Sequence, residues 1–531
     1  MYSENKIYIG KSANSKVFIY PSMANRHGLI AGATGTGKTI TLKVLAESFS
    51  DCGVPVFFSD VKGDLAAMCN AGSPNENVQK RIDELGLAAD GFDYKAYPTC
   101  FWDVYGECGL PLRTTISEMG PLLLGRIMGL NDTQIDVLTI VFKIADEEEL
   151  LLIDIKDLRS MLQFVSENSD QYSMKYGNIA KQSVAAIIRS LSAIEAEGGD
   201  LFFGEPALDI KDWIRTDNTG RGIIEVLDCR TLINHPTMYA TFLLWMMSEL
   251  FETLPEAGDL DKPRMIFFFD EAHLLFDDAP KSLKQKIEQV VKLIRSKGVG
   301  IYFVTQSPSD IPDGVLAQLG NKVQHALRAY TPAEQKAVKA AAQSYRANPA
   351  FDTYQTLLEL GIGEALISVL DEGGVPTMVE RATILPPQSQ MGALDDGTRQ
   401  RQINASDLYV RYAEAIDRDS AYEFLERHRA AMAEEEQRAK EEAAAEKQRL
   451  KDEAAAEKQR LKDEAAAKKA AEKEAKEAKK AVNSIAGTAA GTIGREIGNT
   501  FGKSIGGAFG KRLGGNMGAA LGRGLLKTFL K

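Results

Sequence analysis

Cysteine is scarce in this 531-residue sequence, and no two cysteines form a Cys-x-x-Cys pair. An odd number of cysteines without paired spacing argues against a disulfide framework and against a zinc site. The pattern is typical of free thiols in a reducing compartment. The five cysteines are Cys52, Cys69, Cys100, Cys108 and Cys229.

The sequence also lacks a long hydrophobic run. No stretch approaches the roughly 20 apolar residues that a membrane-spanning helix needs. The first ten residues, MYSENKIYIG, do not have the basic and then apolar pattern of a secretory signal. We therefore expect a cytoplasmic protein.

A net positive charge is missing from most of the chain. The formal net charge is −11, but residues 481–531 carry +6 and residues 434–480 are neutral, so the first 433 residues carry −17. Binding to nucleic acid requires local positive charge. The acidic body therefore argues against a protein that coats DNA over its whole surface, although it leaves room for a narrow basic channel.

Residues 1–380 alternate short apolar runs with amphipathic, helix-like stretches, which predicts an α/β fold. The runs are almost entirely apolar, as expected for parallel strands that are buried on both faces. With 44% hydrophobic residues, the chain can form a sizeable core. The predicted strands are His27–Ala31, Val54–Ser59, Ile223–Leu227, Met265–Phe269 and Ile301–Thr305.

Changes in this pattern indicate domain boundaries. We expect the α/β core to consist of residues 1–113 and 201–385, separated by an all-helical insertion at 114–200. A Pro/Gln/Gly-rich stretch then predicts a linker, followed by an amphipathic helix from Ser406 to about Arg429, within residues 386–430.

The following segment, 431–481, is rich in Ala, Glu and Lys and predicts a long charged helix. It contains the sequence EAAAEKQRLKD twice, at Glu442–Asp452 and Glu453–Asp463. An 11-residue period is compatible with a right-handed coiled coil. Each repeat has only one leucine, Leu450 or Leu461, which is a thin seam, so a solitary charged helix or spacer is favoured over the coiled coil.

The tail, 482–531, is basic and glycine-rich. Glycine recurs at every fourth position from Gly494 to Gly522, and each of these glycines follows a large apolar residue. On a helix this pattern would give a surface for helix contact, membrane or nucleic acid. Because glycine disfavours isolated helices, a tail that orders only with a partner is the alternative.

The strongest motif is G-x-x-x-x-G-K-[ST], which lies between the strand His27–Ala31 and a helix-like stretch. Its glycines allow the backbone N–H groups and a helix N-terminus to approach phosphates. Lys38 is expected to contact the β and γ phosphates of ATP, and the Thr39 hydroxyl is expected to bind Mg²⁺. The eight residues are Gly32, Ala33, Thr34, Gly35, Thr36, Gly37, Lys38 and Thr39.

Two acidic residues follow the apolar strand Met265–Phe269. Asp270 is expected to hold Mg²⁺, and Glu271 is expected to polarise the attacking water as a general base. A helix N-cap is the alternative explanation for this pair. His273 is expected to be structural.

A third polar residue, Gln306, follows the strand Ile301–Thr305. Its amide is expected to sense the γ-phosphate or to orient the water, and the alternative is that it caps the Ser307–Pro308 turn. The charged segment Asp60–Asp64 follows another predicted strand, so it is expected near the same cleft. Its role stays open.

Five segments of this sequence together resemble the HerA/FtsK superfamily, and in particular the short bacterial HerA-like proteins that are labelled helicase-like. A further segment, Ala413–Leu425, resembles that group as well. The resemblance covers about residues 1–430. The five segments are Arg26–Thr39, Asp60–Asp64, Phe267–His273, Leu293–Pro312 and Gln324–Pro332.

The resemblance implies a RecA-like P-loop NTPase core that works as a hexameric ring around DNA. It also implies that an arginine of the neighbouring subunit completes the ATP site, for which Arg295 and Arg328 are the candidates. Full-length HerA motors carry a β-barrel before the core. Here only about 26 residues precede the first core strand, which is room for a hairpin at most.

Two functional hypotheses follow. The first is an ATP-driven DNA translocase or helicase, whose hydrolysis DNA would stimulate. The second is an ATPase of the same fold that remodels or scaffolds protein or membrane complexes, with residues 482–531 as its docking segment. Its hydrolysis would be indifferent to DNA.

Overall fold

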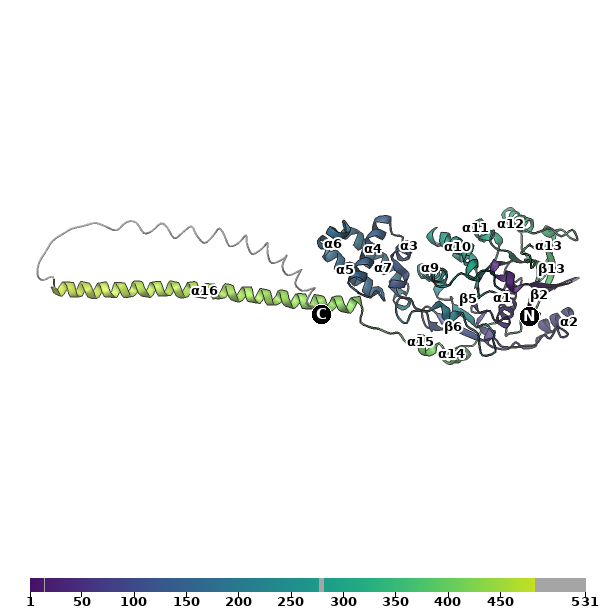
Figure 1. Cartoon of the computed structure of the whole chain (residues 1–531), viewed down its shortest axis with the longest axis horizontal. Coiled ribbons are helices and arrows are strands. Elements are labelled where there is room, and N and C mark those ends of the chain that lie inside the picture. The colour runs from purple at the N-terminus through teal and green to yellow at the C-terminus, as the bar shows by residue number, and fades with distance from the viewer. Residues whose placement is uncertain (14, 277–280, 483–531) are drawn as a thin grey trace. The chain divides into compact units, whose positions relative to one another are not determined.

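The computed structural model describes residues 1–13, 15–276 and 281–482. The chain divides into two compact units, Met1–Met432 and Ala433–Lys531. The first unit contains all of the β-structure and the predicted site residues, and Figure 1 labels its helices and strands.

One 13-stranded sheet forms the centre of the first unit, in the order β1-β2-β13-β12-β11-β4-β10-β9-β5-β8-β6-β7, with β3 paired to β2. The strands are β1 Tyr2–Ser3, β2 Lys6–Ser12, β3 Lys16–Ile19, β4 Gly28–Ala31, β5 Val56–Asp60, β6 Thr99–Asp103, β7 Leu110–Pro111, β8 Ile224–Asp228, β9 Met265–Phe269, β10 Val299–Thr305, β11 Asn321–His325, β12 Glu364–Ser368 and β13 Glu380–Ile384.

The sheet is parallel from β11 to β7 and antiparallel from β11 to β1. The five predicted strands are confirmed as β4, β5, β8, β9 and β10, which are neighbours in the parallel part. Every residue of these strands is buried. This burial explains their apolar sequences, because helices cover a parallel sheet on both faces. The α/β fold with a mostly parallel sheet is therefore confirmed.

The N-terminal residues form the antiparallel pair β2–β3, and β2 joins the sheet through β13. Strands β2 and β3 thus form a hairpin. The helices around the sheet are α1 Lys38–Asp51, α2 Glu76–Leu85, α9 Pro236–Thr253, α10 Lys281–Leu293, α11 Asp313–Leu316, α12 Pro332–Gln343, α13 Thr353–Glu359, α14 Asp396–Ala405 and α15 Tyr409–Tyr412.

The predicted insertion is helical, and Figure 1 shows α3 to α7 gathered into one cluster. Reciprocal capping boxes start three of these helices, at Thr115, Asn131 and Asp154. Each satisfies N–H groups that a helix N-terminus otherwise leaves unpaired. The helices are α3 Ile116–Ile127, α4 Asp132–Glu147, α5 Ile155–Glu167, α6 Ser169–Tyr176, α7 Lys181–Ala196 and α8 Gly199–Phe202.

The prediction of a linker after residue 385 is wrong. Gln388 and Ser389 are buried, and their amides donate to the carboxylate of Glu47, each at 2.9 Å. Further on, the buried Arg399 forms an ion pair of 3.2 Å with Asp228. Gln388, Ser389 and Arg399 thus attach this segment to the core. Its polar composition predicted a linker, but these polar groups have buried partners.

The prediction of one amphipathic helix from Ser406 to about Arg429 is also wrong. The segment forms α15 and then a non-helical stretch, in which the amide of Ile416 donates to the Glu205 carbonyl at 2.9 Å. The next helix, α16, begins at Ala421. The Ser420 hydroxyl and amide both donate to the Glu423 carboxylate, at 2.6 and 3.1 Å, and this contact fixes the start.

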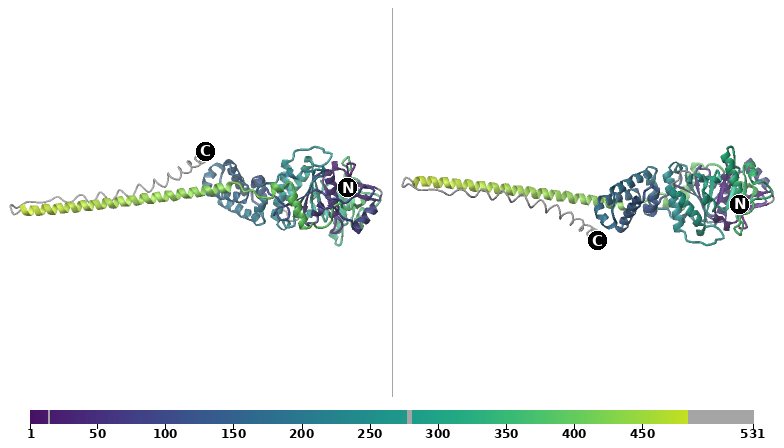
Figure 2. Two further views of the ribbon diagram at one scale, coloured as in Figure 1. Left: turned by 90° about the horizontal axis from the view of Figure 1, so that it is seen from below. Right: turned by 90° about the horizontal axis from the view of Figure 1, so that it is seen from above.

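Helix α16 spans Ala421–Val482 and continues into the second unit, where Figure 2 shows it as one continuous helix. Leu450 and Leu461 are 57% and 58% exposed. The coiled coil stays a prediction, because the structure contains a single chain. The predicted glycine-rich tail, 482–531, lies from residue 483 onward outside the described residues. Among the helices of the described part, none is long and apolar enough to cross a membrane.

Candidate active site

The carboxyl ends of four adjacent strands, β4, β10, β9 and β5, meet at one edge of the sheet. Thr305 pairs with Ala31, Phe303 pairs with Phe269, and Ser59 also pairs with Phe269. The residues that follow these strands are therefore brought together although they come from four distant parts of the chain. This edge is where ligands bind in open α/β sheets.

The glycine-rich loop after β4 has the backbone that the motif requires. Gly32, Gly35 and Gly37 have φ values of 156°, 78° and 116°, a region that residues with a side chain rarely adopt. A Cβ atom on Gly32 would lie 2.5 Å from the Cβ atom of His325. Within the described residues, no protein acceptor receives the amides of Thr34, Gly35 and Gly37. They are available to an anion.

Hydrogen bonds from three other segments hold this loop in place. The Gly32 amide donates to the Thr305 carbonyl at 3.2 Å, and the Ala33 amide donates to the Ala326 carbonyl at 2.9 Å. The Gly363 amide donates to the Thr36 carbonyl at 2.9 Å. These bonds preorganise the loop between β10, β11 and the turn before β12.

Lys38, the first residue of α1, folds back onto its own loop. Its Nζ donates to the Gly32 carbonyl at 2.6 Å and to the Ala33 carbonyl at 3.3 Å. The side chain is 7% exposed, and burial lowers its pKa, while the nearby carboxylates of Glu271 and Asp270 act in the opposite direction. A phosphate would offer this ammonium group a stronger acceptor than a carbonyl.

Sequence reasoning missed His325, which lies beneath the loop at the end of β11. Its Nε2 is 2.8 Å from the Thr41 hydroxyl, and its Nδ1 is 3.0 Å from the Glu364 carbonyl. Burial lowers its pKa to about 4. The ring is therefore neutral, with Nδ1–H as the donor to Glu364 and Nε2 as the acceptor from Thr41. The spacing of residues gives no signal for this contact, since 284 residues separate Thr41 from His325.

The buried His325 predicts a pH-dependent stability. Between pH 6.5 and 4 the unfolded chain binds a proton that the folded His325 does not bind, so its contribution to stability is lost as the pH falls. Between pH 7.5 and 5 this loss amounts to about 2 kcal/mol. We expect the destabilisation caused by His325→Gln, measured by urea unfolding, to shrink by that amount over this range. Other titrating groups cancel in the difference, so a destabilisation independent of pH would contradict the prediction.

Asp270 and Glu271 follow β9 at the same edge, and both are buried, with 6% and 7% exposure. The pKa of Asp270 is raised to about 7, mainly by burial; the neighbouring Glu271 and Asp64 carboxylates act in the same direction and Lys62 acts in the opposite one. Glu271 has φ 47° and ψ 49°, a left-handed conformation that costs about 1 kcal/mol. Glu271 occupies the N-cap position of the 3₁₀ helix Ala272–Leu275, but its side chain accepts no capping hydrogen bond from that helix.

The two oxygens of the Glu271 carboxylate have different partners. Oε1 forms an ion pair with Lys62. Oε2 is 3.5 Å from Nε2 of Gln306 and 3.3 Å from Nδ1 of His273. Burial opposes the charged form, but the contact with Lys62 outweighs it and the pKa of Glu271 is lowered. Gln306 therefore lies toward Glu271, and the following turn is capped by the Ser307 side chain instead.

The segment Asp60–Asp64 forms a tight turn after β5. The buried Asp60 carboxylate accepts the amides of Gly63 and Leu65 at 2.7 and 3.2 Å. Burial raises the pKa of Asp60 to about 6, with Asp64 as the next contribution. Asp60 thus holds the turn that presents Lys62 to Glu271.

The two candidate arginines lie at opposite edges of the parallel strands. Arg295 lies in a short 3₁₀ helix, Ile294–Lys297, which precedes β10. Arg328 follows β11, two residues after Ala326, whose carbonyl binds the phosphate loop. Both side chains are exposed, and neither forms an ion pair or a side-chain hydrogen bond with the described part of the chain.

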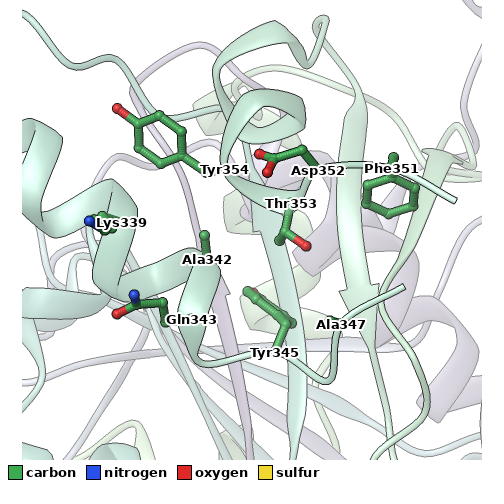
Figure 3. Close-up of a pocket in the computed structure, with 9 residues that line it drawn as sticks. All are labelled: Lys339, Ala342, Gln343, Tyr345, Ala347, Phe351, Asp352, Thr353 and Tyr354. Atoms are coloured by element: carbon green, nitrogen blue, oxygen red, sulfur yellow. The ribbon is translucent and has the colours of Figure 1, made fainter. Parts of the chain in front are cut away.

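A separate surface hollow lies between α12 and α13 (Figure 3). The ring of Tyr345 forms part of its wall, together with residues from the start of α13. None of the predicted site residues lines it. The residues that do are Lys339, Ala342, Gln343, Tyr345, Ala347, Phe351, Asp352, Thr353 and Tyr354.

Known structures with a similar fold include VirB4 of Thermoanaerobacter pseudethanolicus, with 15% identity, a TM-score of 0.45, and coverage of 72% of this chain and 97% of that one. Another is the plasmid coupling protein TrwB in complex with the ATP analogue ADPNP, with 12% identity, a TM-score of 0.47, and coverage of 74% and 91%.

Among curated proteins, the chain is 22% identical over 378 residues to the DNA double-strand break repair helicase HerA of Sulfurisphaera tokodaii, which covers 69% of this chain and 67% of that protein. It is 30% identical over 139 residues to "Probable helicase MJECL08" of Methanocaldococcus jannaschii, and this match spans only 25% of each chain. The family model described as "Helicase HerA-like C-terminal" matches residues 5–513. The resemblance in the sequence motifs is thereby confirmed, and the chain belongs to the helicase HerA-like C-terminal family.

Proposed function

We propose that this chain is an ATP hydrolase of the HerA/FtsK type that works as a ring of copies and couples hydrolysis to DNA translocation or unwinding. The observation that carries the proposal is the convergence of Lys38, Glu271 and Gln306 at one sheet edge. The adjacent base and amide favour water over another acceptor for the γ-phosphate.

The residues present fit ATP and Mg²⁺. The loop offers unpaired amides, and the first N–H groups of α1 point toward the same place. The Thr39 hydroxyl and the Asp270 carboxylate are the residues that would hold Mg²⁺, which screens the phosphate charge when it is bound. Across the described residues, no group of three or more His, Cys, Asp or Glu side chains could hold a metal. Mg²⁺ takes most of its ligands from phosphate and water, so it requires few ligands from the protein.

Each side chain then has a role in hydrolysis. Lys38 turns from the Gly32 carbonyl to the β and γ phosphates and balances their charge. Glu271 accepts the proton of the attacking water, and Gln306 orients that water or senses the γ-phosphate. All three groups are positioned by buried strands, so little reorganisation is needed for the reaction.

The exposed arginines support the proposal of a ring. Arg295 lies at the strand edge opposite its own phosphate loop, so it is suited to reach the site of a neighbouring copy. Arg328 lies at the edge of its own loop and is the second candidate for this role. In either position an arginine would stabilise the charge of the transition state and tie hydrolysis to the subunit boundary.

The test is ATP hydrolysis by the purified chain with and without double- and single-stranded DNA at low salt, together with the mass in solution. We expect a hexamer whose hydrolysis rises several-fold with DNA, an effect that salt weakens. Robust hydrolysis that ignores every DNA would contradict the motor. It would favour the remodelling or scaffolding of protein or membrane partners through residues 482–531.

A further inference from the structure

The ion pair between Lys62 and Glu271 has no place in the mechanism described above. Lys62 comes from the turn after β5, and Glu271 follows the neighbouring strand β9. The Glu271 side chain is 9% exposed and the Lys62 side chain is 45% exposed. Lys62 therefore contacts one carboxylate oxygen of Glu271, the proposed general base, from the solvent side.

The turn that carries Lys62 is rigid, whereas the side chain is not. Both oxygens of the buried Asp60 carboxylate accept backbone amides of this turn, from Gly63 and Leu65. Among the described residues, the Lys62 ammonium group donates a hydrogen bond to Glu271 alone. A lysine side chain can exchange partners by rotation about its own bonds, without any backbone movement.

Lys62 also lies within electrostatic range of the phosphate loop. Lys38 and Lys62 repel each other, and the carboxylates of Asp270 and Glu271 act on both lysines. Lys62 therefore interacts with the same carboxylates as Lys38, the lysine of the phosphate loop. The additional negative charge of a third phosphate would attract both lysines.

We propose that Lys62 is a nucleotide-sensing residue that binds Glu271 at rest and moves to the γ-phosphate of a bound nucleoside triphosphate, which frees the Glu271 carboxylate for water. This inference rests on the proposed ATP site. It assigns to the Asp60–Asp64 turn the function of distinguishing triphosphate from diphosphate.

The exchange has two consequences for binding. A nucleoside diphosphate has no γ-phosphate, so it leaves the Lys62–Glu271 pair in place and gains nothing from Lys62. A triphosphate gains one charge-assisted contact but must displace the carboxylate. Removing the carboxylate therefore strengthens triphosphate binding only where Lys62 is present.

The test is calorimetric titration of four proteins, namely the wild type, Lys62→Met, Glu271→Gln and the double variant, with AMPPNP and with ADP in the presence of Mg²⁺. We expect Lys62→Met to weaken AMPPNP binding about tenfold and ADP binding less than about twofold. As a single substitution, Glu271→Gln should strengthen AMPPNP binding several-fold. Added to Lys62→Met, it should strengthen AMPPNP binding much less. Lys62→Arg should keep the preference for AMPPNP within about threefold, because it keeps the charge.

A matched ion pair provides the control. Lys175 and Glu147 form an exposed pair in the helical insertion, and Lys175→Met and Glu147→Gln should change neither affinity. Lys62→Met could lower the affinities for AMPPNP and ADP equally, or the two substitutions could have additive effects on affinity in the double variant. Either result would overturn the sensing role of Lys62 but not the proposed function. A wild type that binds neither nucleotide would overturn the proposed function as well.

Discussion

Glu271→Gln is expected to lower the rate of ATP hydrolysis by about 100- to 10,000-fold while ATP binding persists. Glutamine has the size of glutamate and keeps a hydrogen-bonding group beside Gln306, but it cannot accept a proton from water. The left-handed backbone at this position suits both residues equally, because they have the same branching at Cβ. The fold should therefore be unaffected.

Single-turnover hydrolysis separates this chemical step from product release, and calorimetry with ATP measures binding independently. Glu288→Gln is the control, because Glu288 forms an exposed ion pair of 2.6 Å with Lys292 on α10, outside the site. It should hydrolyse ATP at the rate of the wild type. Full activity of Glu271→Gln would show that Glu271 is not the general base. Loss of ATP binding would show that Glu271 acts in the binding of nucleotide.

The five strands were predictable from the sequence because each is buried on both faces and is therefore almost entirely apolar. Strand β11 pairs in parallel with β4 in the same sheet. It was not predicted, since Asn321, Gln324 and His325 interrupt its apolar pattern. The structure shows why these polar residues are tolerated. The side-chain Nδ2 of Asn321 donates to the carbonyls of Met23 and His27, each at 3.1 Å. Both ring nitrogens of His325 have hydrogen-bond partners. Such distant partners leave no trace in the local sequence.

The start of α16 illustrates a different error. The amphipathic pattern predicts a helix through residues 413–420, although Ser420 and Glu423 have the spacing of a capping box. The capping box is the stronger local signal, because it satisfies N–H groups at the start of a helix. In the candidate site, too, only part of the arrangement was predictable from the sequence. The motifs predicted which residues lie at the sheet edge, but not the ion pair between Lys62 and Glu271, which are 209 residues apart.

Lys38→Met is expected to weaken the binding of both ADP and AMPPNP by at least about 100-fold. Two or more charge-assisted contacts to phosphate would be lost, each worth about 1.5–3 kcal/mol, and about 3 kcal/mol corresponds to a factor of more than 100 in affinity. The fold should persist, because methionine fills a similar volume. The loop is also held by backbone bonds to Thr305, Ala326 and Gly363 that do not involve this side chain.

The comparison of two nucleotides distinguishes the two lysines of the site. Lys38→Met should weaken the binding of both ADP and AMPPNP strongly, since the β-phosphate is common to both, whereas Lys62→Met should weaken AMPPNP alone. If Lys38→Met unfolds at nearly the same temperature as the wild type, its fold is intact, and a loss of affinity is then due to the nucleotide site itself. If Lys38→Met bound ADP with the affinity of the wild type, the loop would not hold the β-phosphate. The convergence of Lys38 with Glu271 would then have another purpose than the hydrolysis of ATP.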